Sequence, residues 1–201
     1  MKKLLITTLT CLMVLGISTT ARAVLLPLGG SFLPTGVASP GAAGVPLYTT
    51  TVNYLTSSGK ALGIFTQNVR NSTGNAGWIV YEYLFSSSNA STTDIIRLSS
   101  IDFGNFAINA DAIGVSVAPL AITRDSFGST VGANYLLHPN NTTNLLWFEV
   151  NSPYIGLGHS YIQNGGQADI VTWCPVIPEP TSMALLGLGV LGLFGLRKKI
   201  A

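Results

Sequence analysis

Hydrophobic and polar residues alternate in short runs through the middle of the chain. In the clearest run, residues 78–85, four large apolar side chains share one face and Glu82 lies on the other. Residues 145–150 repeat the pattern, with Glu149 opposite three apolar side chains. The apolar faces comprise Ile79, Tyr81, Tyr83 and Phe85 in the first run and Leu146, Phe148 and Val150 in the second. A period of two is typical of strands with one buried face, so we expect these segments to be adjacent or facing core strands.

Weaker runs of the same kind fill most of the remaining chain between residues 47 and 177. They predict further strands at residues 47–55, 60–69, 94–98, 103–108, 113–117, 120–123, 135–137 and 169–173. Residues that favour turns separate them, at 56–59, 71–77, 86–93, 139–144 and 164–166. This region shows no sustained helical period. Many short strands joined by turns predict an all-β fold, a single antiparallel β-sandwich or jelly-roll-like domain.

The chain divides into a central domain and two terminal segments of different composition. About 150 residues lie between the two ends, which is enough for one domain and too few for two. Residues 24–46 form an uncharged segment rich in Gly and Pro, predicted to be extended or an edge strand with turns, and residues 47–177 form the β-rich passenger domain.

The first 23 residues have the organisation of a secretory signal peptide. Lys2 and Lys3 supply the positive region, residues 4–17 the apolar region, and Ala21 and Ala23 the small residues of a cleavage site. The apolar run is shorter than the roughly 20 residues of a membrane-spanning helix and contains three threonines. We therefore expect export by the Sec machinery and removal of residues 1–23 by signal peptidase.

The last residues of the chain, 178–201, combine three different elements. Pro178, Glu179 and Pro180 come first, residues 181–196 form an apolar run, and a basic group, Arg197, Lys198 and Lys199, follows almost at the end. The run predicts a transmembrane helix about 24 Å long, a short span for a hydrocarbon core of roughly 30 Å. Since basic residues stay on the cytoplasmic side, the β-domain should lie outside.

This tripartite tail resembles the PEP-CTERM sorting signal of exported bacterial proteins. The resemblance implies that an inner-membrane exosortase recognises and cuts the chain near Pro178, Glu179 and Pro180. It further implies transient anchoring in the inner membrane, followed by release or transfer to the cell surface or the extracellular space. Residues 81–83, 124–128 and 146–150 also look like parts of the small β-rich passengers of such proteins, and they carry no catalytic motif.

Charge and cysteine content narrow the choice of partners. The whole chain has a formal charge of +2, but between residues 24 and 177 four basic residues face seven acidic ones, a net charge of −3. Phosphate neutralisation needs clustered basic residues, so we exclude nucleic acid as a partner. Cys11 leaves with the signal peptide, so Cys174 has no partner for an internal disulfide. Cys174 is either a small buried residue near the end of the last strand or a surface thiol that can form an intermolecular disulfide.

Candidate catalytic groups are few. Glu82 and Glu149 could form a carboxylate pair for glycosidic cleavage, but their positions opposite the apolar faces predict ordinary solvent-facing residues. Gly158, His159 and Ser160 resemble part of a nucleophile elbow, but Ile162 stands where a second glycine is required. We expect that tripeptide to be a polar loop before the last strand. No catalytic residue is therefore assigned.

Metal ligands are equally sparse, and no cofactor is expected. The two histidines, His138 and His159, lack partners at the spacing of a zinc site. Asn109, Asp111 and Asp102 offer oxygen atoms but depart from the calcium-loop pattern, so we interpret them as solvated turn residues.

These observations favour a non-enzymatic structural or adhesive protein of the cell surface or of the extracellular matrix of a biofilm, with extracellular polysaccharide as a partner. Two alternatives stay open. A secreted carbohydrate-active enzyme would need two carboxylates converging in a cleft. A carbohydrate-binding module would need exposed aromatic residues on one face, for which Trp78, Trp147 and Trp173 are the candidates.

Overall fold

The computed structural model describes residues 24–41 and 44–176, whose regular elements are all β-strands. The strands are β1 (Val24–Leu25), β2 (Ser31–Phe32), β3 (Tyr48–Leu55), β4 (Leu62–Asn71), β5 (Ile79–Ser87), β6 (Ile95–Ser100), β7 (Ile108–Ile113), β8 (Ala121–Arg124), β9 (Val131–Leu137), β10 (Leu145–Val150), β11 (Ile155–Gln163) and β12 (Gln167–Pro175). The predicted signal peptide and the predicted transmembrane helix lie outside the described residues.

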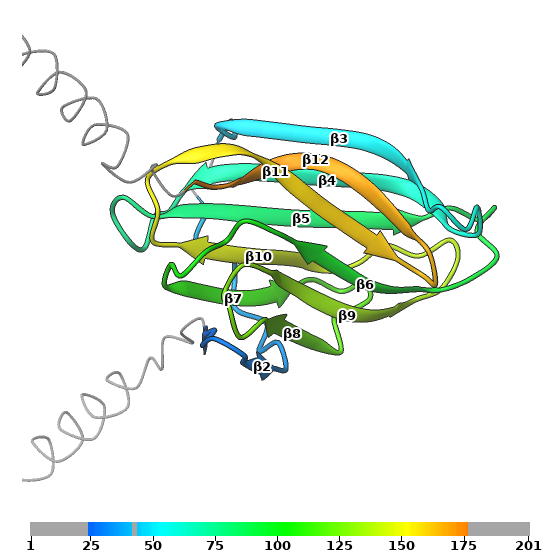
Figure 1. The fold of residues 1–201 in the computed structure, drawn as a ribbon, viewed down its shortest axis with the longest axis horizontal. Helices are drawn as coiled ribbons and strands as arrows, with labels where there is room; N and C mark the ends of the chain where they lie inside the picture. The colour runs from blue at the N-terminus through cyan, green and yellow to red at the C-terminus, as the bar shows by residue number, and fades with distance from the viewer. Residues whose placement is uncertain (1–23, 42–43, 177–201) are drawn as a thin grey trace, which may run out of the picture.

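The strands form two six-stranded sheets packed face to face (Figure 1). We call them sheet A, in the order β1-β7-β10-β5-β4-β3, and sheet B, in the order β12-β11-β6-β9-β8-β2. Neighbouring strands within each sheet run antiparallel. The prediction of an all-β antiparallel sandwich is confirmed.

The core lies between the sheets and is built from the alternating apolar positions. β5 and β10 are neighbours, with Tyr83 opposite Leu146 and Tyr81 opposite Phe148, so the two strongest sequence patterns lie side by side as expected. Aromatic edges meet aromatic faces in this layer, with ring centroids 5.9 Å apart for Tyr83 and Phe148 and 5.7 Å apart for Phe103 and Phe148. Such T-shaped pairs add to the stabilisation that apolar burial itself provides.

Three local predictions are wrong. Residues 103–107 form a loop, because Asp102 and Gly104 have positive φ and turn the chain before β7 begins at Ile108. Residues 114–117 leave β7 at Gly114, also at positive φ, and keep only a single bridge from Val117 to Thr143. Residues 158–160, expected to be a loop, lie in the middle of β11.

The segment before the main strands takes part in both sheets and then crosses sheet A. β1 pairs with β7 and β2 pairs with β8. Residues 33–41, which we call the strap, then run over the outer face of sheet A, where Gly41 bridges to Ser72 beyond β4. The outer face of this antiparallel sheet is therefore partly covered by the chain itself.

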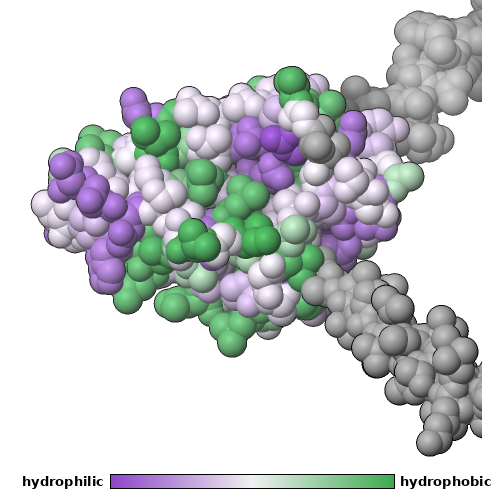
Figure 2. Space-filling model, turned by 180° about the vertical axis from the view of Figure 1, so that it is seen from behind, coloured by the Kyte–Doolittle hydropathy of each residue, from purple (hydrophilic) through white to green (hydrophobic). Residues whose placement is uncertain are grey.

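The two ends of the described chain lie at the same end of the sandwich. In Figure 1, the blue start of the described chain and the last part of β12 both lie toward the left, whereas β5 runs to the right, where it ends at Ser87. We call the end at which β5 stops the distal end. Figure 2, which views the molecule from behind, shows hydrophilic residues gathered at its left, which is this distal end.

Candidate functional site

The two carboxylates expected to face solvent are buried. Glu82 on β5 and Glu149 on β10 point away from the core, as the alternation requires, but only 7% and 2% of their surfaces are exposed. The strap and the loop at residues 72–77 cover them, since Ser39 and Ser72 donate hydrogen bonds to these acids. The prediction of solvent-facing residues is wrong because it depended on a contact between distant parts of the chain.

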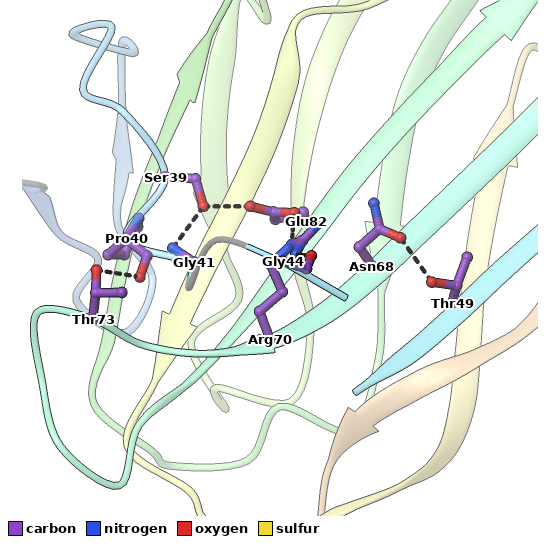
Figure 3. Close-up of polar contacts among 9 residues, drawn as sticks. All are labelled: Ser39, Pro40, Gly41, Gly44, Thr49, Asn68, Arg70, Thr73 and Glu82. Carbon is purple, nitrogen blue, oxygen red and sulfur yellow. Dashed lines mark hydrogen bonds and ion pairs between the residues drawn. The ribbon is translucent and has the colours of Figure 1, made fainter. Parts of the chain in front are cut away.

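Glu82 holds the strap and β4 together (Figure 3). Its Oε1 accepts a hydrogen bond of 2.6 Å from Ser39 Oγ, and its Oε2 lies 2.9 Å from Arg70 Nε. Arg70 also donates to the carbonyl oxygen of Gly44, at 2.5 Å. Ser39 Oγ in turn accepts from the Gly41 amide. The charge of Glu82 is therefore balanced by a partly buried guanidinium and used to fix the strap.

Glu149 fastens the loop at residues 72–77. The side-chain amide of Asn75 donates to both carboxylate oxygens at 2.9 Å, and Asn109 Nδ2 donates to Oε2 at 2.8 Å. Ser72 Oγ donates to Oε1. The hydrogen-bonding capacity of both carboxylate oxygens is therefore satisfied by neutral side chains of the loop and of β7.

Asp111 on β7 binds the backbone of the strap. Its oxygens accept from the amides of Thr35 at 2.8 Å, Gly36 at 3.1 Å and Val37 at 3.1 Å, and from the Thr35 hydroxyl. The amide of Ala112 adds a bond of 2.7 Å. Asp111 is fully buried, so these donors take the place of solvent around its charge. The interpretation of Asp111 as a solvated turn residue is wrong, because its partners in the strap are distant in the sequence.

Trp147 on β10 also binds the strap, in addition to the three buried acids. Its indole Nε1 donates to the carbonyl oxygen of Val37 at 3.0 Å, and the residue is fully buried. The strap therefore crosses β7, β10, β5 and β4 and is fixed over most of this path. The hydrogen bonds of Asp111, Glu82 and Glu149 anchor the strap and the loop at residues 72–77 to sheet A.

The histidines and Ser160 do not assemble a nucleophilic site. His159 pairs with Asp169 through Nδ1 at 2.7 Å on the outer face of sheet B. Ser160, the next residue of β11, faces the opposite way and is buried among hydroxyls, 3.0 Å from Ser100 Oγ and 3.0 Å from Thr172 Oγ1. A base must reach the hydroxyl that it activates, and adjacent strand residues point to opposite faces.

The side chains considered as metal ligands in the sequence are also separated. Asn109 and Asp111 are on β7 and bind Glu149 and the strap, whereas Asp102 lies in a loop at positive φ. His138 pairs with Asp94, at 2.8 Å. Within residues 24–41 and 44–176, no group of three or more His, Cys, Asp or Glu side chains could hold a metal ion.

Cys174 is a buried thiol. Only 1% of its surface is exposed, and burial, together with the negative charge of Asp102, raises its pKa to about 11. The alternative of a surface thiol is therefore wrong, and the simpler interpretation of a small buried residue holds. Gly156 is the partner of Cys174 on β11, and a Cβ atom added at Gly158, two residues along that strand, would come within 2.6 Å of the sulfur.

The three tryptophans do not share one exposed face. Trp147 is buried beneath the strap, and Trp78 and Trp173 are half-buried. Trp173 stacks on Tyr48, with ring centroids 4.1 Å apart. The aromatic platform that a carbohydrate-binding module of the predicted kind requires is therefore missing from this set of residues.

The residues assigned to export and sorting lie outside the described part of the chain. They are the cleavage residues Ala21 and Ala23, the motif Pro178, Glu179 and Pro180, and the membrane stop Arg197, Lys198 and Lys199. Among the residues that are described, none belongs to a helix long and apolar enough to cross a membrane.

Comparison with known proteins found a match for the C-terminal tail. Neither the curated proteins nor the solved structures contain a match to this chain. Residues 176–199 match the family model of the PEP-CTERM protein-sorting motif, which agrees with the interpretation of Pro178, Glu179, Pro180 and the following residues. The chain therefore carries an exosortase substrate signal and is an exported, exosortase-sorted protein.

Proposed function

We propose that the β-sandwich is a non-enzymatic structural or adhesive component of the cell surface or extracellular matrix. Sec-dependent export and signal peptidase deliver the precursor, and the exosortase releases or transfers it at the tail. Extracellular polysaccharide is the proposed partner of the exported domain.

The proposal rests on the burial and the hydrogen bonding of three acidic residues. Asp111, Glu82 and Glu149 are all buried, and each binds two or more groups of the strap, of β4 or of the 72–77 loop. A glycoside hydrolase needs an acid and a second carboxylate that reach the scissile bond from a cleft. Because these acids stabilise the fold, their arrangement supports the proposal of a domain that binds polysaccharide or assembles into the matrix.

The arrangement of the sandwich supports a surface role. Both ends of the described chain lie at one end of the domain, so a tail held in the membrane leaves the distal end pointing outward (Figure 1). The loops at that end, residues 88–94 and 138–144, are rich in Ser, Thr and Asn. Hydroxyl and amide groups of this kind suit hydrogen bonding to hydrated polymers.

The processed protein, purified from the surface or medium of cells that contain the exosortase, provides the test. We expect it to co-sediment with polysaccharide from the same cells and to release no new reducing ends. Absence of co-sedimentation would contradict the adhesive role. Release of reducing ends that disappears in Glu82→Gln or Glu149→Gln would instead establish the rival function, a secreted carbohydrate-active enzyme.

A further inference from the structure

A pocket of 530 Å³ opens at the distal end of the sandwich, between the ends of β3, β4 and β5 and the loop before β10. We call it the tip pocket. Its polar lining includes Asn53, Ser86, Asn89, Asn140 and Thr142, and Ile64 adds an apolar wall. The volume lies within the range of about 300–1,000 Å³ that is common for small-molecule sites.

The lining of the tip pocket is neutral and offers free hydrogen-bonding groups. None of the described residues that form it carries a charge. The side chains of Asn53, Asn140 and Thr142 are exposed and make no hydrogen bond within the described part of the protein. Each amide presents two donors and an acceptor with two lone pairs, so two such groups can bind neighbouring hydroxyls of one ligand.

Two other hydroxyls at the tip pocket are not open to a ligand. Only 3% of the surface of Ser87 is exposed, its Oγ is inaccessible to solvent, and that oxygen has no hydrogen-bond partner among the described residues. The neighbouring Tyr54 hydroxyl already donates to the Ser86 carbonyl oxygen at 2.7 Å. A ligand would therefore be held by the exposed side chains of Asn53, Asn140 and Thr142.

We propose that the tip pocket binds a neutral saccharide unit of an extracellular polysaccharide, an inference that rests on the proposed function and names its site. Ring hydroxyls would bond to Asn53, Asn140 and Thr142, and the apolar face of the sugar ring would pack on Ile64, which is 49% exposed. A uronic acid unit fits less well, because its carboxylate would lose solvent without gaining a basic partner.

The test uses the processed protein and four hexasaccharides. Three are neutral, namely cellohexaose, mannohexaose and chitohexaose, and the fourth is an oligogalacturonate of the same length. Calorimetry gives the dissociation constant, and NMR follows the side-chain amide signals of Asn53 and Asn140. We expect at least one neutral oligosaccharide to bind and to shift both signals, and the oligogalacturonate to bind more weakly.

Two variants remove pocket amides, and a third is the matched control. Asn140 has a φ of 65°, so Asn140→Gly removes its amide without straining the backbone. Asn53→Ala removes the other. Each should weaken binding about three- to tenfold, the loss expected for one or two hydrogen bonds. Asn151→Ala, at an exposed asparagine away from the pocket, should bind like the unmodified protein.

Three results would overturn the tip pocket as a neutral saccharide site: no binding of any neutral hexasaccharide, unchanged binding in both pocket variants, or tighter binding of the oligogalacturonate. If the unmodified protein still co-sediments with the cells' polysaccharide in any of these cases, the proposed function stands and only the pocket assignment fails. Loss of co-sedimentation by the unmodified protein itself contradicts the proposed function.

Discussion

The side-chain amide of Gln67 joins the two sheets by pairing with both main-chain polar groups of Trp173. Gln67 Nε2 donates to the Trp173 carbonyl oxygen at 2.8 Å, and the Trp173 amide donates to Gln67 Oε1 at 2.8 Å. Gln67 is on β4, and Trp173 is on β12, an edge strand whose outer backbone groups lack a neighbouring strand. Ser57 plays the same part at the other end of β12, with bonds to the Gln167 carbonyl oxygen and amide.

Replacing Gln67 by Leu should destabilise the domain by about 2 kcal/mol, because two main-chain groups of Trp173 would lose their partner. The free energy of unfolding in urea measures this. Asn68→Ala, one residue along β4 on the other face, removes only an exposed bond to Thr49 and should cost less than about 0.5 kcal/mol. Equal losses in the two variants would contradict a bridging role for Gln67.

Removing the hydroxyl group from each of two tyrosines on β5 should change the stability of the domain differently. Tyr81 and Tyr83 are both fully buried, but the Tyr81 hydroxyl is unpaired among the described residues, whereas Tyr83 bonds to Ser100 Oγ at 3.2 Å. Tyr81→Phe should leave stability unchanged or raise it by about 1 kcal/mol, and Tyr83→Phe should lower it by a similar amount. Thermal unfolding distinguishes them, and a clear loss of stability in Tyr81→Phe would contradict the unpaired state.

The pairing of β5 with β10 could be predicted because each strand alternates cleanly between core and outer residues. β11 could not, since Gly156, Gly158 and Ser160 resemble a turn. Gly158 is required there by the close approach of Cys174, which only the assembled sheet reveals. Ser160 is tolerated because Ser100 and Thr172 supply its hydrogen bonds.

The position of the strap on sheet A could not be predicted from the sequence either, because it depends on contacts between distant residues. Alternation correctly places Glu82 and Glu149 on the outer face of sheet A, but it cannot say what covers that face. The contacts that bury them join residues far apart in the sequence, such as Ser39 to Glu82 and Ser72 to Glu149. An uncharged, Gly- and Pro-rich segment predicts extended chain, whereas its partners depend on the fold of the rest.

Asp111 should control the attachment of the strap. Asp111→Ala removes the acceptor of five hydrogen bonds, four of them from residues 35–37, and should release this part of the strap while Glu82 still holds Ser39. We expect faster cleavage by proteinase K within residues 33–41, located by mass spectrometry. Asp169→Ala, at an exposed acid, is the control. Equal cleavage rates in both variants would show that Asp111 does not secure the strap.

Alkaline pH should destabilise the domain through Cys174. Burial raises the pKa of this thiol from its usual value near 9 to about 11, so the folded state retains a proton that the unfolded state loses. Stability is then complete below about pH 9 and falls as the pH rises toward 11. The urea midpoint should drop between pH 8 and pH 10, and drop less in Cys174→Ala. A pH dependence that is identical in the variant would assign the effect to other groups.

The sorting signal combines a motif with two prolines and one acid, an apolar run and a basic group, and we expect sorting to depend on each of them. Pro178 and Pro180 cannot donate backbone hydrogen bonds, so the peptide around Glu179 should stay extended and accessible outside the membrane. We expect the carboxylate of Glu179 to be held just above the apolar run, where a membrane-embedded exosortase can bind it. Glu179→Ala should leave the precursor uncut in the inner membrane, and deletion of residues 197–199 should leave it there or reverse its orientation.

Cell fractionation and the intact mass of the protein test this prediction, with the unmodified chain in a strain lacking the exosortase as the reference for the uncut form. Glu179→Ala should match that reference in mass and location, because the charge that marks the cleavage region is gone while the apolar run is intact. Asp169→Ala is the matched control, since it removes a carboxylate from the exposed surface of the domain and should be processed normally. If Glu179→Ala and the deletion both reached the cell surface at the mass of the unmodified protein, neither Glu179 nor the basic group would be read in sorting, and recognition would have to rest on the prolines and the apolar run alone.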